Sequence, residues 1–258
     1  MDISAIHKET GAYWDEIAGS YGGRNADEDA AFLASGGSFF SEPERRLLGD
    51  LSPRCRRAIH LQCSHGNDAL SLLRQGAAEV VGIDISERLL EIAERKALAL
   101  AASAQWVHAD ILETPSRLDG TADLVYTGKG ALCWMLDLPA WAQVVTRLLV
   151  PGGRLFIWEG HPLDWVWDLN ADSYTLDPEH GDYFSEKFRN RLFSRETEAT
   201  PYYRQWTLGQ IVSSVIGAGL VLDHLQEYPE PFWNQFPSIP VGSLRKLPHT
   251  FALIAHKP

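Results

Sequence analysis

Ligand-capable side chains follow several short apolar segments, at the positions where a bound small molecule would be contacted. Each segment has the length and composition of a buried strand. The groups that follow are CSHGND after residues 58–62, Asp84 at the end of 79–84, Asp110 after 104–108, and Tyr126, Thr127 and Gly128 at the end of the segment that begins at 122. Carboxylates and small polar groups at successive strand ends favour recognition of a nucleoside.

Asp84 is the most informative of these residues. A carboxylate that closes the second strand can accept both hydroxyls of a ribose without a metal. Its alternative role is to cap the next helix, but Ser86 already fills that role. Asp110 could accept a hydrogen bond from an adenine amino group while the amide of Ile111 meets the ring, or it could be a turn residue before a helix.

The elements that must position these residues alternate between strand and helix. Strands are predicted at 58–62, 79–84, 104–108, 122–126 and 154–159, and helices at 67–74, after Ser86 and at 139–150. Because crossovers between parallel strands are right-handed, this alternation predicts a doubly wound, mostly parallel α/β sheet. Two further strand candidates after the capped helix that begins near Thr207, VLDHLQEY and TFALIAH, predict an antiparallel edge hairpin. The whole is a seven-stranded, Rossmann-like sheet.

Two segments fall outside this alternation within one predicted domain, 1–258. Residues 1–40 contain a short amphipathic helix candidate at 12–17 and glycine-rich turns, and we interpret them as a lid or arm. Residues 161–206 lack a regular pattern, and a long loop of this kind is usually functional. We interpret this insertion as a substrate cap because it is rich in aromatic residues, which include Trp165, Trp167, Tyr174, Tyr183, Phe184, Phe188, Phe193, Tyr202 and Tyr203.

Composition limits the partners and the compartment. The formal net charge is −11, whereas nucleic-acid binding draws most of its affinity from Lys and Arg; we expect a small-molecule partner and no nucleic acid. No stretch reaches the roughly 18 apolar residues of a membrane helix, and the N-terminus lacks the pattern of a signal peptide. We expect no membrane association, a cytoplasmic location, and a monomer or homodimer. Cys55, Cys63 and Cys133 lack zinc spacing and predict reduced core thiols and no metal site.

Five segments, in order, resemble the motifs of class I S-adenosylmethionine-dependent methyltransferases. They are AIHLQCSHGNDALSL, VVGIDIS, VHADIL, ADLVYTGKGALCW and RLLVPGGRLFIWEGHP. LLVPGGRLFI is the most specific, and five matches in the right order and spacing are strong where one would be weak. The resemblance implies S-adenosylmethionine as the cofactor and a small-molecule methyl acceptor.

The first motif departs from the family pattern. His60 stands where an acid is usual, Gln62 and Ser64 replace the first two glycines, and Gly66 remains. A dinucleotide enzyme needs GxGxxG to bring amides around a pyrophosphate, but S-adenosylmethionine has no phosphate. We expect Gly66 to lie where a side chain would strike the cofactor. His60 could organise the loop or be satisfied locally, and Gln62 and Ser64 either hydrogen-bond the methionine end or only shape the turn.

The predicted site follows from these motifs. The cofactor contacts are assigned to Gln62, Cys63, Ser64, Gly66, Asp84, Ile85, Asp110, Ile111 and Tyr126, with Trp14 and Tyr21 of the arm closing over them. Trp134, Trp158 and Tyr183 are predicted to line the acceptor pocket. Tyr126 and Trp134 have packing as their alternative role.

Methyl transfer requires orientation, exclusion of water and, for some acceptors, removal of a proton. His161 is the candidate general base, and Glu159 could orient it or hold a cationic acceptor; alternatively both tie down the loop. We therefore predict methyl transfer to a nitrogen or oxygen of a small aromatic or amine-bearing metabolite. The alternatives are a nicotinamide-dependent oxidoreductase, disfavoured by the missing glycines, and a non-catalytic S-adenosylmethionine-binding module, disfavoured by the aromatic insertion.

Overall fold

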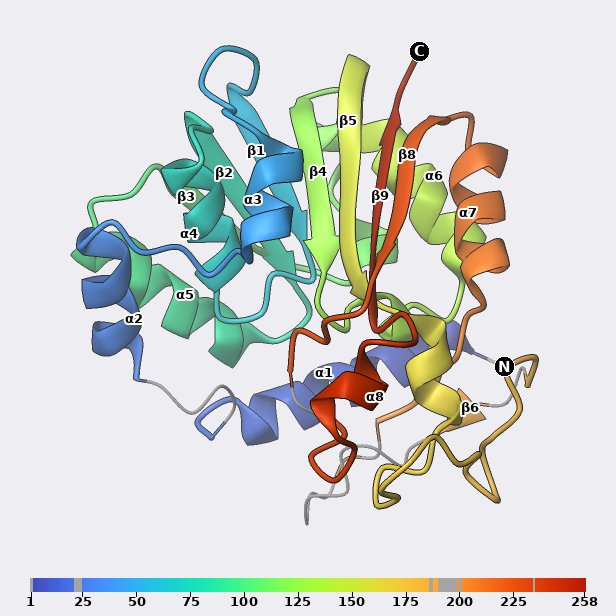
Figure 1. The fold of residues 1–258 in the computed structure, drawn as a ribbon. Coiled ribbons are helices and arrows are strands. Elements are labelled where there is room, and N and C mark those ends of the chain that lie inside the picture. Colours follow the sequence, from blue (N-terminus) through green and yellow to red (C-terminus); the bar gives the residue numbers. More distant parts are fainter. Residues whose placement is uncertain (1, 21–24, 186–187, 190–198, 200, 234) are drawn as a thin grey trace.

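The computed structural model describes residues 2–20, 25–185, 188–189, 199, 201–233 and 235–258. A seven-stranded sheet in the order β3-β2-β1-β4-β5-β9-β8 forms its centre (Figure 1). The strands are β1 (Arg57–Leu61), β2 (Glu79–Asp84), β3 (Ala104–His108), β4 (Ala122–Gly128), β5 (Leu149–Gly160), β8 (Val221–Tyr228) and β9 (Thr250–His256). Strands β1 to β5 are parallel, and β9 and β8 form the antiparallel edge. The predicted fold class is confirmed.

Helices cover both faces of this sheet. They are α1 (Ile3–Ile17), α2 (Ala26–Ala34), α3 (Glu42–Leu48), α4 (Asn67–Arg74), α5 (Glu87–Ala99), α6 (Leu138–Leu148), α7 (Leu208–Gly217) and α8 (Val241–Leu244). Short 3₁₀ helices are η1 (Ile111–Glu113), η2 (Ser116–Leu118), η3 (Leu132–Trp134) and η4 (Pro162–Val166). None of the helices in the described ranges is long and apolar enough to cross a membrane.

The core is divided by the sheet into two apolar clusters. On one face Trp141 and Val145 of α6 pack against Val125 of β4. On the other, Leu72 of α4 packs into the cluster that contains Tyr126. Burial on both faces explains why the central strands are continuous apolar runs, and it fixes the strand ends where the ligand-capable residues lie.

Local sequence signals set most of the boundaries. The hydroxyl of Ser86 accepts a hydrogen bond from the Leu89 amide at the start of α5, and Thr207 and Gln210 form the predicted capping box of α7. Two boundaries differ: α1 begins at Ile3 because Asp2 caps it, and β5 begins at Leu149, which pairs with Ala122. Residues 149–150, predicted as the end of the helix at 139–150, are thus part of an extended β5.

Several segments meet at the end of the sheet where β1 to β5 finish. Figure 1 shows α1, α8 and the two-stranded ribbon of β6 (Phe188–Arg189) and β7 (Tyr203–Arg204) at this end. The segment between β8 and β9 was predicted as part of a simple hairpin, but it includes α8 and also lies there. Of the two predicted accessory segments, Tyr21 and Phe193 lie outside the described residues.

Candidate cofactor and acceptor site

A cavity of about 830 Å³ lies at the carboxyl ends of the parallel strands. Its wall contains most of the predicted site residues: Trp14, Gln62, Cys63, Ser64, Asp84, Ile85, Asp110, Ile111, Trp134, Trp158, Glu159 and His161. The ends of β1, β2, β3, β4 and β5 therefore converge on one space, as the strand pattern predicts. Gly66, Tyr126 and Tyr183 are not part of this wall.

Tyr126 and Tyr183 have structural contacts elsewhere. Tyr126 is fully buried in the core, where its hydroxyl donates a hydrogen bond to Glu44 and its ring packs edge-on against His60. The hydroxyl of Tyr183 accepts a hydrogen bond from the Leu208 amide at the start of α7. These contacts disfavour the predicted cofactor contact of Tyr126 and the predicted acceptor contact of Tyr183, which stay predictions.

Gly66 is required by the protein's own packing. Its φ is +82°, and a Cβ there would lie 2.7 Å from both Ala93 and Trp106. A side chain at Gly66 would therefore clash with α5 and β3, whether or not it would also strike the cofactor, which stays a prediction. Gly66 lets α4 begin close to those elements.

The turn after β1 keeps a glycine-like backbone without glycine. Gln62 has φ of 52° and Ser64 has φ of 50°, both in the left-handed region that costs other residues about 1–2 kcal/mol each. The two positions where the family pattern has glycine thus adopt a backbone conformation that glycine favours. Such strain in a cavity wall is typical of a functional site.

Hydrogen bonds within the protein stabilise this strained turn. The side-chain amide of Gln62 donates to the carbonyl of Ala131 at 2.9 Å and accepts from the hydroxyl of Thr127 at 3.2 Å. The Ser64 amide donates to Asp84 at 2.7 Å. Of the two roles left open for Gln62, shaping the turn is the one these contacts support.

Asp84 is buried but retains hydrogen-bonding capacity. One carboxylate oxygen accepts from the Ser64 amide and the other from the Ser86 amide, at 2.7 and 3.0 Å. Burial raises the pKa of Asp84, and the two amide hydrogen bonds oppose this shift. A carboxylate has about four acceptor sites, so each oxygen can still accept a ribose hydroxyl.

Asp110 is joined to the N-terminal helix. Its Oδ2 lies 2.7 Å from Nδ1 of His7 in α1, and its Oδ1 accepts from the Leu112 amide at 2.9 Å. His7 also lines the cavity, and its Nε2 is buried without a partner among the described residues. No sequence pattern pointed to His7, because its partner Asp110 is 103 positions away.

Glu159 organises the loop after β4. Its carboxylate accepts from the amides of Gly130, of Ala131 at 2.8 Å and of Leu132 at 3.0 Å, and from its own neighbour Gly160 at 2.8 Å. Burial raises its pKa while these amides oppose the shift. These contacts favour the alternative role, in which Glu159 ties down a loop. The roles of orienting His161 and of holding a cationic acceptor stay predictions.

We expect Glu159→Ala to lower the free energy of unfolding by about 3 kcal/mol or more, because it leaves several buried amides without an acceptor. Urea denaturation followed by tryptophan fluorescence measures this. Glu159→Gln is the matched control, since it keeps an acceptor oxygen and should lose markedly less. A loss below about 1 kcal/mol for alanine would contradict this role.

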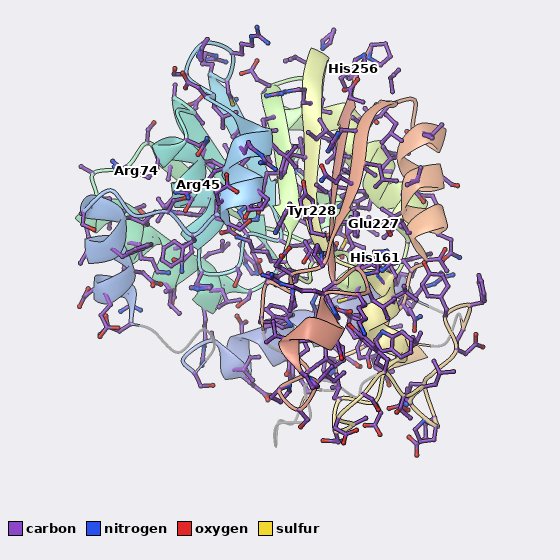
Figure 2. The ribbon with its side chains drawn as sticks, in the orientation of Figure 1. Arg45, Arg74, His161, Glu227, Tyr228 and His256 are labelled. Atoms are coloured by element: carbon purple, nitrogen blue, oxygen red, sulfur yellow. The ribbon has the colours of Figure 1, made fainter. Side chains whose placement is uncertain are left out.

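His161 lies in the cavity wall, with a hydrogen bond at Nδ1 and Nε2 within ion-pair distance of Glu227. Nδ1 accepts from the Leu163 amide at 3.1 Å, so the neutral ring carries its proton on Nε2, which lies 2.8 Å from Oε1 of Glu227 (Figure 2). Burial lowers its pKa, although Glu227 opposes the shift. The base role of His161 stays a prediction, and this arrangement disfavours it.

A second carboxylate, Asp164, borders the same cavity. It is 6% exposed, with one oxygen 2.7 Å from Nδ1 of His249 and the other accepting from the side chain of Gln235 at 3.1 Å. Burial raises its pKa to about 6, with His249 opposing the shift.

Aromatic side chains form another part of the cavity lining, which we call the aromatic wall. Its residues are Trp14, Trp134, Trp158, Trp165, Trp206, Phe232 and Trp233.

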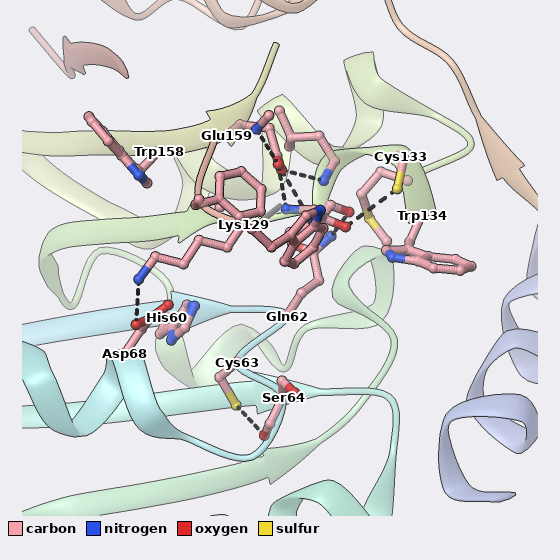
Figure 3. A pocket seen from close by; sticks show the side chains of 18 of the residues that line it. His60, Gln62, Cys63, Ser64, Asp68, Lys129, Cys133, Trp134, Trp158 and Glu159 are labelled. Carbon is pink, nitrogen blue, oxygen red and sulfur yellow. Dashed lines mark hydrogen bonds and ion pairs between the residues drawn. The ribbon is translucent and has the colours of Figure 1, made fainter. Parts of the chain in front are cut away.

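Charged residues that the sequence analysis missed lie near the first turn (Figure 3). Lys129, which directly follows β4, donates to Asp68 at 2.7 Å and lies 3.5 Å from Glu44. All three line the cavity together with His60. Lys129 stands at a strand end, so the rule that drew attention to Asp84 and Asp110 could have found it.

The fold and the site define the class of protein. A doubly wound sheet whose acids after β2 and β3 share one cavity is a Rossmann-like nucleoside-cofactor fold. No group of three or more His, Cys, Asp or Glu side chains in the described part of the chain could hold a metal ion.

Comparisons with known proteins relate the first five strands of the sheet to methyltransferases. Residues 58–153 match the model described as a methyltransferase domain. A trans-aconitate 2-methyltransferase of Methylobacterium radiotolerans is 38% identical over 40% of this chain and 37% of its own length. A demethylmenaquinone methyltransferase of Thermus thermophilus is 36% identical over 42% and 48%, respectively. The chain thus spans less than half the length of these two relatives.

The solved structures agree with the fold. The crystal structure of an S-adenosylmethionine-dependent methyltransferase from Mesorhizobium loti has a TM-score of 0.64 and 21% identity, over 83% of this chain and 96% of that one. Together these similarities support a class I S-adenosylmethionine-dependent methyltransferase. S-adenosylmethionine is its cofactor, and the lone pairs left open on Asp84 fit the ribose hydroxyls of that group.

Proposed function

We propose that the protein transfers the methyl group of S-adenosylmethionine to a nitrogen or oxygen of a small aromatic or amine-bearing molecule. One observation carries this proposal. A single cavity contains Asp84 and Asp110, the carboxylates proposed to bind the nucleoside, together with the aromatic wall and Asp164. Its volume of about 830 Å³ lies within the usual range of about 300–1,000 Å³ for ligand sites.

Methyl transfer does not require the protein to form a covalent bond with either reactant. When bound, S-adenosylmethionine supplies the methyl group and its positive sulfur the leaving group. The chain's residues orient the two reactants and exclude water. The aromatic wall suits both tasks, because aromatic faces attract a cation and cover the reacting atoms.

Asp164 is the proton acceptor that we propose in place of His161. Each of its oxygens has one donor, so lone pairs remain for an acceptor N–H or O–H. A pKa of about 6 keeps it ionised near neutrality while leaving it basic enough to take a proton. His249, which is 1% exposed, holds its orientation.

The balance of charge favours a neutral or cationic acceptor over an anionic one. The acids that line the cavity are Glu44, Asp68, Asp84, Asp110, Glu159 and Asp164, and the lysine and arginine residues that do so are Lys129 and Arg204. An amine entering beside Asp164 would meet a complementary charge, whereas a carboxylate would be repelled.

A screen for release of S-adenosylhomocysteine tests this function. Matched sets of arylamines, phenols and aryl carboxylates are incubated with enzyme and S-adenosylmethionine, and turnover is expected with amines or phenols. Binding of S-adenosylmethionine without turnover of any compound would instead support the non-catalytic module. Turnover confined to the carboxylates would contradict the proposed acceptor class.

A further inference from the structure

The cofactor's amino-acid end must lie beyond β2 along the sheet. The order β3-β2-β1-β4 puts the adenine acid Asp110 and the ribose acid Asp84 on successive strands. A ligand that continues in this direction passes the turn after β1 and reaches the end of β4. Its terminal ammonium and carboxylate therefore need partners near Gln62 and Lys129.

The turn itself has few groups left to offer. Both side-chain polar atoms of Gln62 are hydrogen-bonded, one to Thr127 in β4 and the other to Ala131 after it. The amides of Cys63 and Ser64 donate to Ile83 and Asp84, and the Ser64 hydroxyl lies 3.0 Å from the ring of His65. Recognition of two further charges must come from other side chains.

The charged residues beside the turn have that capacity. Oδ1 of Asp68 faces Lys129 at 2.7 Å, and no described residue hydrogen-bonds its Oδ2. The Lys129 ammonium donates to Asp68 and to the Phe39 carbonyl, and its third hydrogen has only Glu44, at 3.5 Å. Both side chains remain partly exposed, at 15% and 20%.

His60 supplies an independent sign of a missing ligand. It is 3% exposed, and its Nδ1 is buried without a hydrogen-bond partner among the described residues. Burial lowers its pKa to about 4, so the ring is neutral and one nitrogen is an acceptor. Buried polar atoms are almost always paired, and His60 lines the cavity beside Asp68 and Lys129 (Figure 3).

We propose that His60, Asp68 and Lys129 bind the amino-acid end of the cofactor, in place of the turn. Asp68 and the neutral ring of His60 accept hydrogen bonds from the ammonium, and Lys129 pairs with the carboxylate. His60, at the position where the family motif has an acid, therefore supplies one acceptor for the ammonium, and Asp68 supplies the other. This inference rests on S-adenosylmethionine as the cofactor, and it assigns recognition to residues outside the glycine positions.

Two ligands separate this subsite from the rest of the site. S-adenosylhomocysteine carries the amino-acid end, and 5′-methylthioadenosine has the same nucleoside and sulfur without it. In calorimetry we expect Asp68→Asn and Lys129→Gln each to weaken S-adenosylhomocysteine at least tenfold, with methylthioadenosine unchanged within about twofold. His60→Phe should act in the same direction.

Controls make each outcome decisive. Asp84→Asn should weaken both ligands, because both contain the ribose, and the double variant Asp68→Asn/Lys129→Gln removes both charges without leaving one unpaired. Retained methylthioadenosine binding shows that a variant is folded. Equal weakening of both ligands, or unchanged binding of S-adenosylhomocysteine, would overturn the assignment. If the unaltered protein binds neither ligand, the cofactor itself is contradicted.

Discussion

Replacing Asp84 by alanine is expected to weaken S-adenosylhomocysteine binding about a hundredfold. The variant loses hydrogen bonds from two ribose hydroxyls to a carboxylate, each about 1.5 kcal/mol, or about 3 kcal/mol together. Asp84 is only 6% exposed, so in the alanine variant water does not readily take over the lost hydrogen bonds to the ribose. Calorimetry measures the affinity directly.

The control for this variant is a nearby acid outside the cavity. Asp15 accepts hydrogen bonds from the Ser86 hydroxyl at 2.6 Å and the Arg88 amide at 3.1 Å, but it does not line the cavity. Asp15→Asn removes a negative charge close to Asp84 and should change affinity by less than about twofold. An Asp84→Ala protein that binds normally while folded would remove the ribose role.

The sheet was predictable because its signals are local. Apolar runs of strand length and the capping serine Ser86 lie within a few residues of what they determine. The ligand-capable residues at strand ends follow from the same regularity, since parallel strands finish at one edge. Asp84, Asp110 and Ser64 were therefore placed at the cavity from the sequence.

The failures involve contacts between distant positions. Glu159 was read through its neighbour His161, but its partners are the amides at 130–132. Tyr126 faces Glu44, 82 positions away. A sequence pattern shows which face a strand buries but not which distant group meets it there. The segment between β8 and β9 was overlooked for a related reason: it carries no regular period, yet Phe232 and Gln235 line the cavity.

The missing glycines have a physical explanation that the sequence alone could not provide. Glycine is favoured at positive φ, but it is not the only residue that can be held there. Gln62 and Ser64 adopt φ near 50° because hydrogen bonds to Ala131 and Asp84 stabilise the turn. Two non-glycine residues thus hold a backbone shape that glycine favours, and neighbouring contacts offset the strain.

Asp164→Asn is expected to lower turnover by about a hundredfold or more with an acceptor that must lose a proton, because a positioned base contributes about 10²–10⁴-fold. Affinity for S-adenosylhomocysteine should stay unchanged, since Asp164 lies at the aromatic end of the cavity. The pH dependence has a definite sign. Burial raises the pKa of Asp164 to about 6, the unprotonated form is the base, and turnover should therefore fall as pH drops through about 6.

Two variants separate a base from a residue that only supports the loop. Asp168→Asn removes a carboxylate from the same insertion, where its oxygen accepts from the Asn170 amide, and should keep both turnover and pH profile. His161→Ala tests the earlier candidate: if Asp164 takes the proton, this variant keeps the fall near pH 6 even where turnover drops. An Asp164→Asn enzyme that retains that fall, measured with an acceptor that does not itself titrate there, would exclude Asp164. A lost fall with His161→Ala would return the base role to His161, with Glu227 moving away from Nε2 to free it.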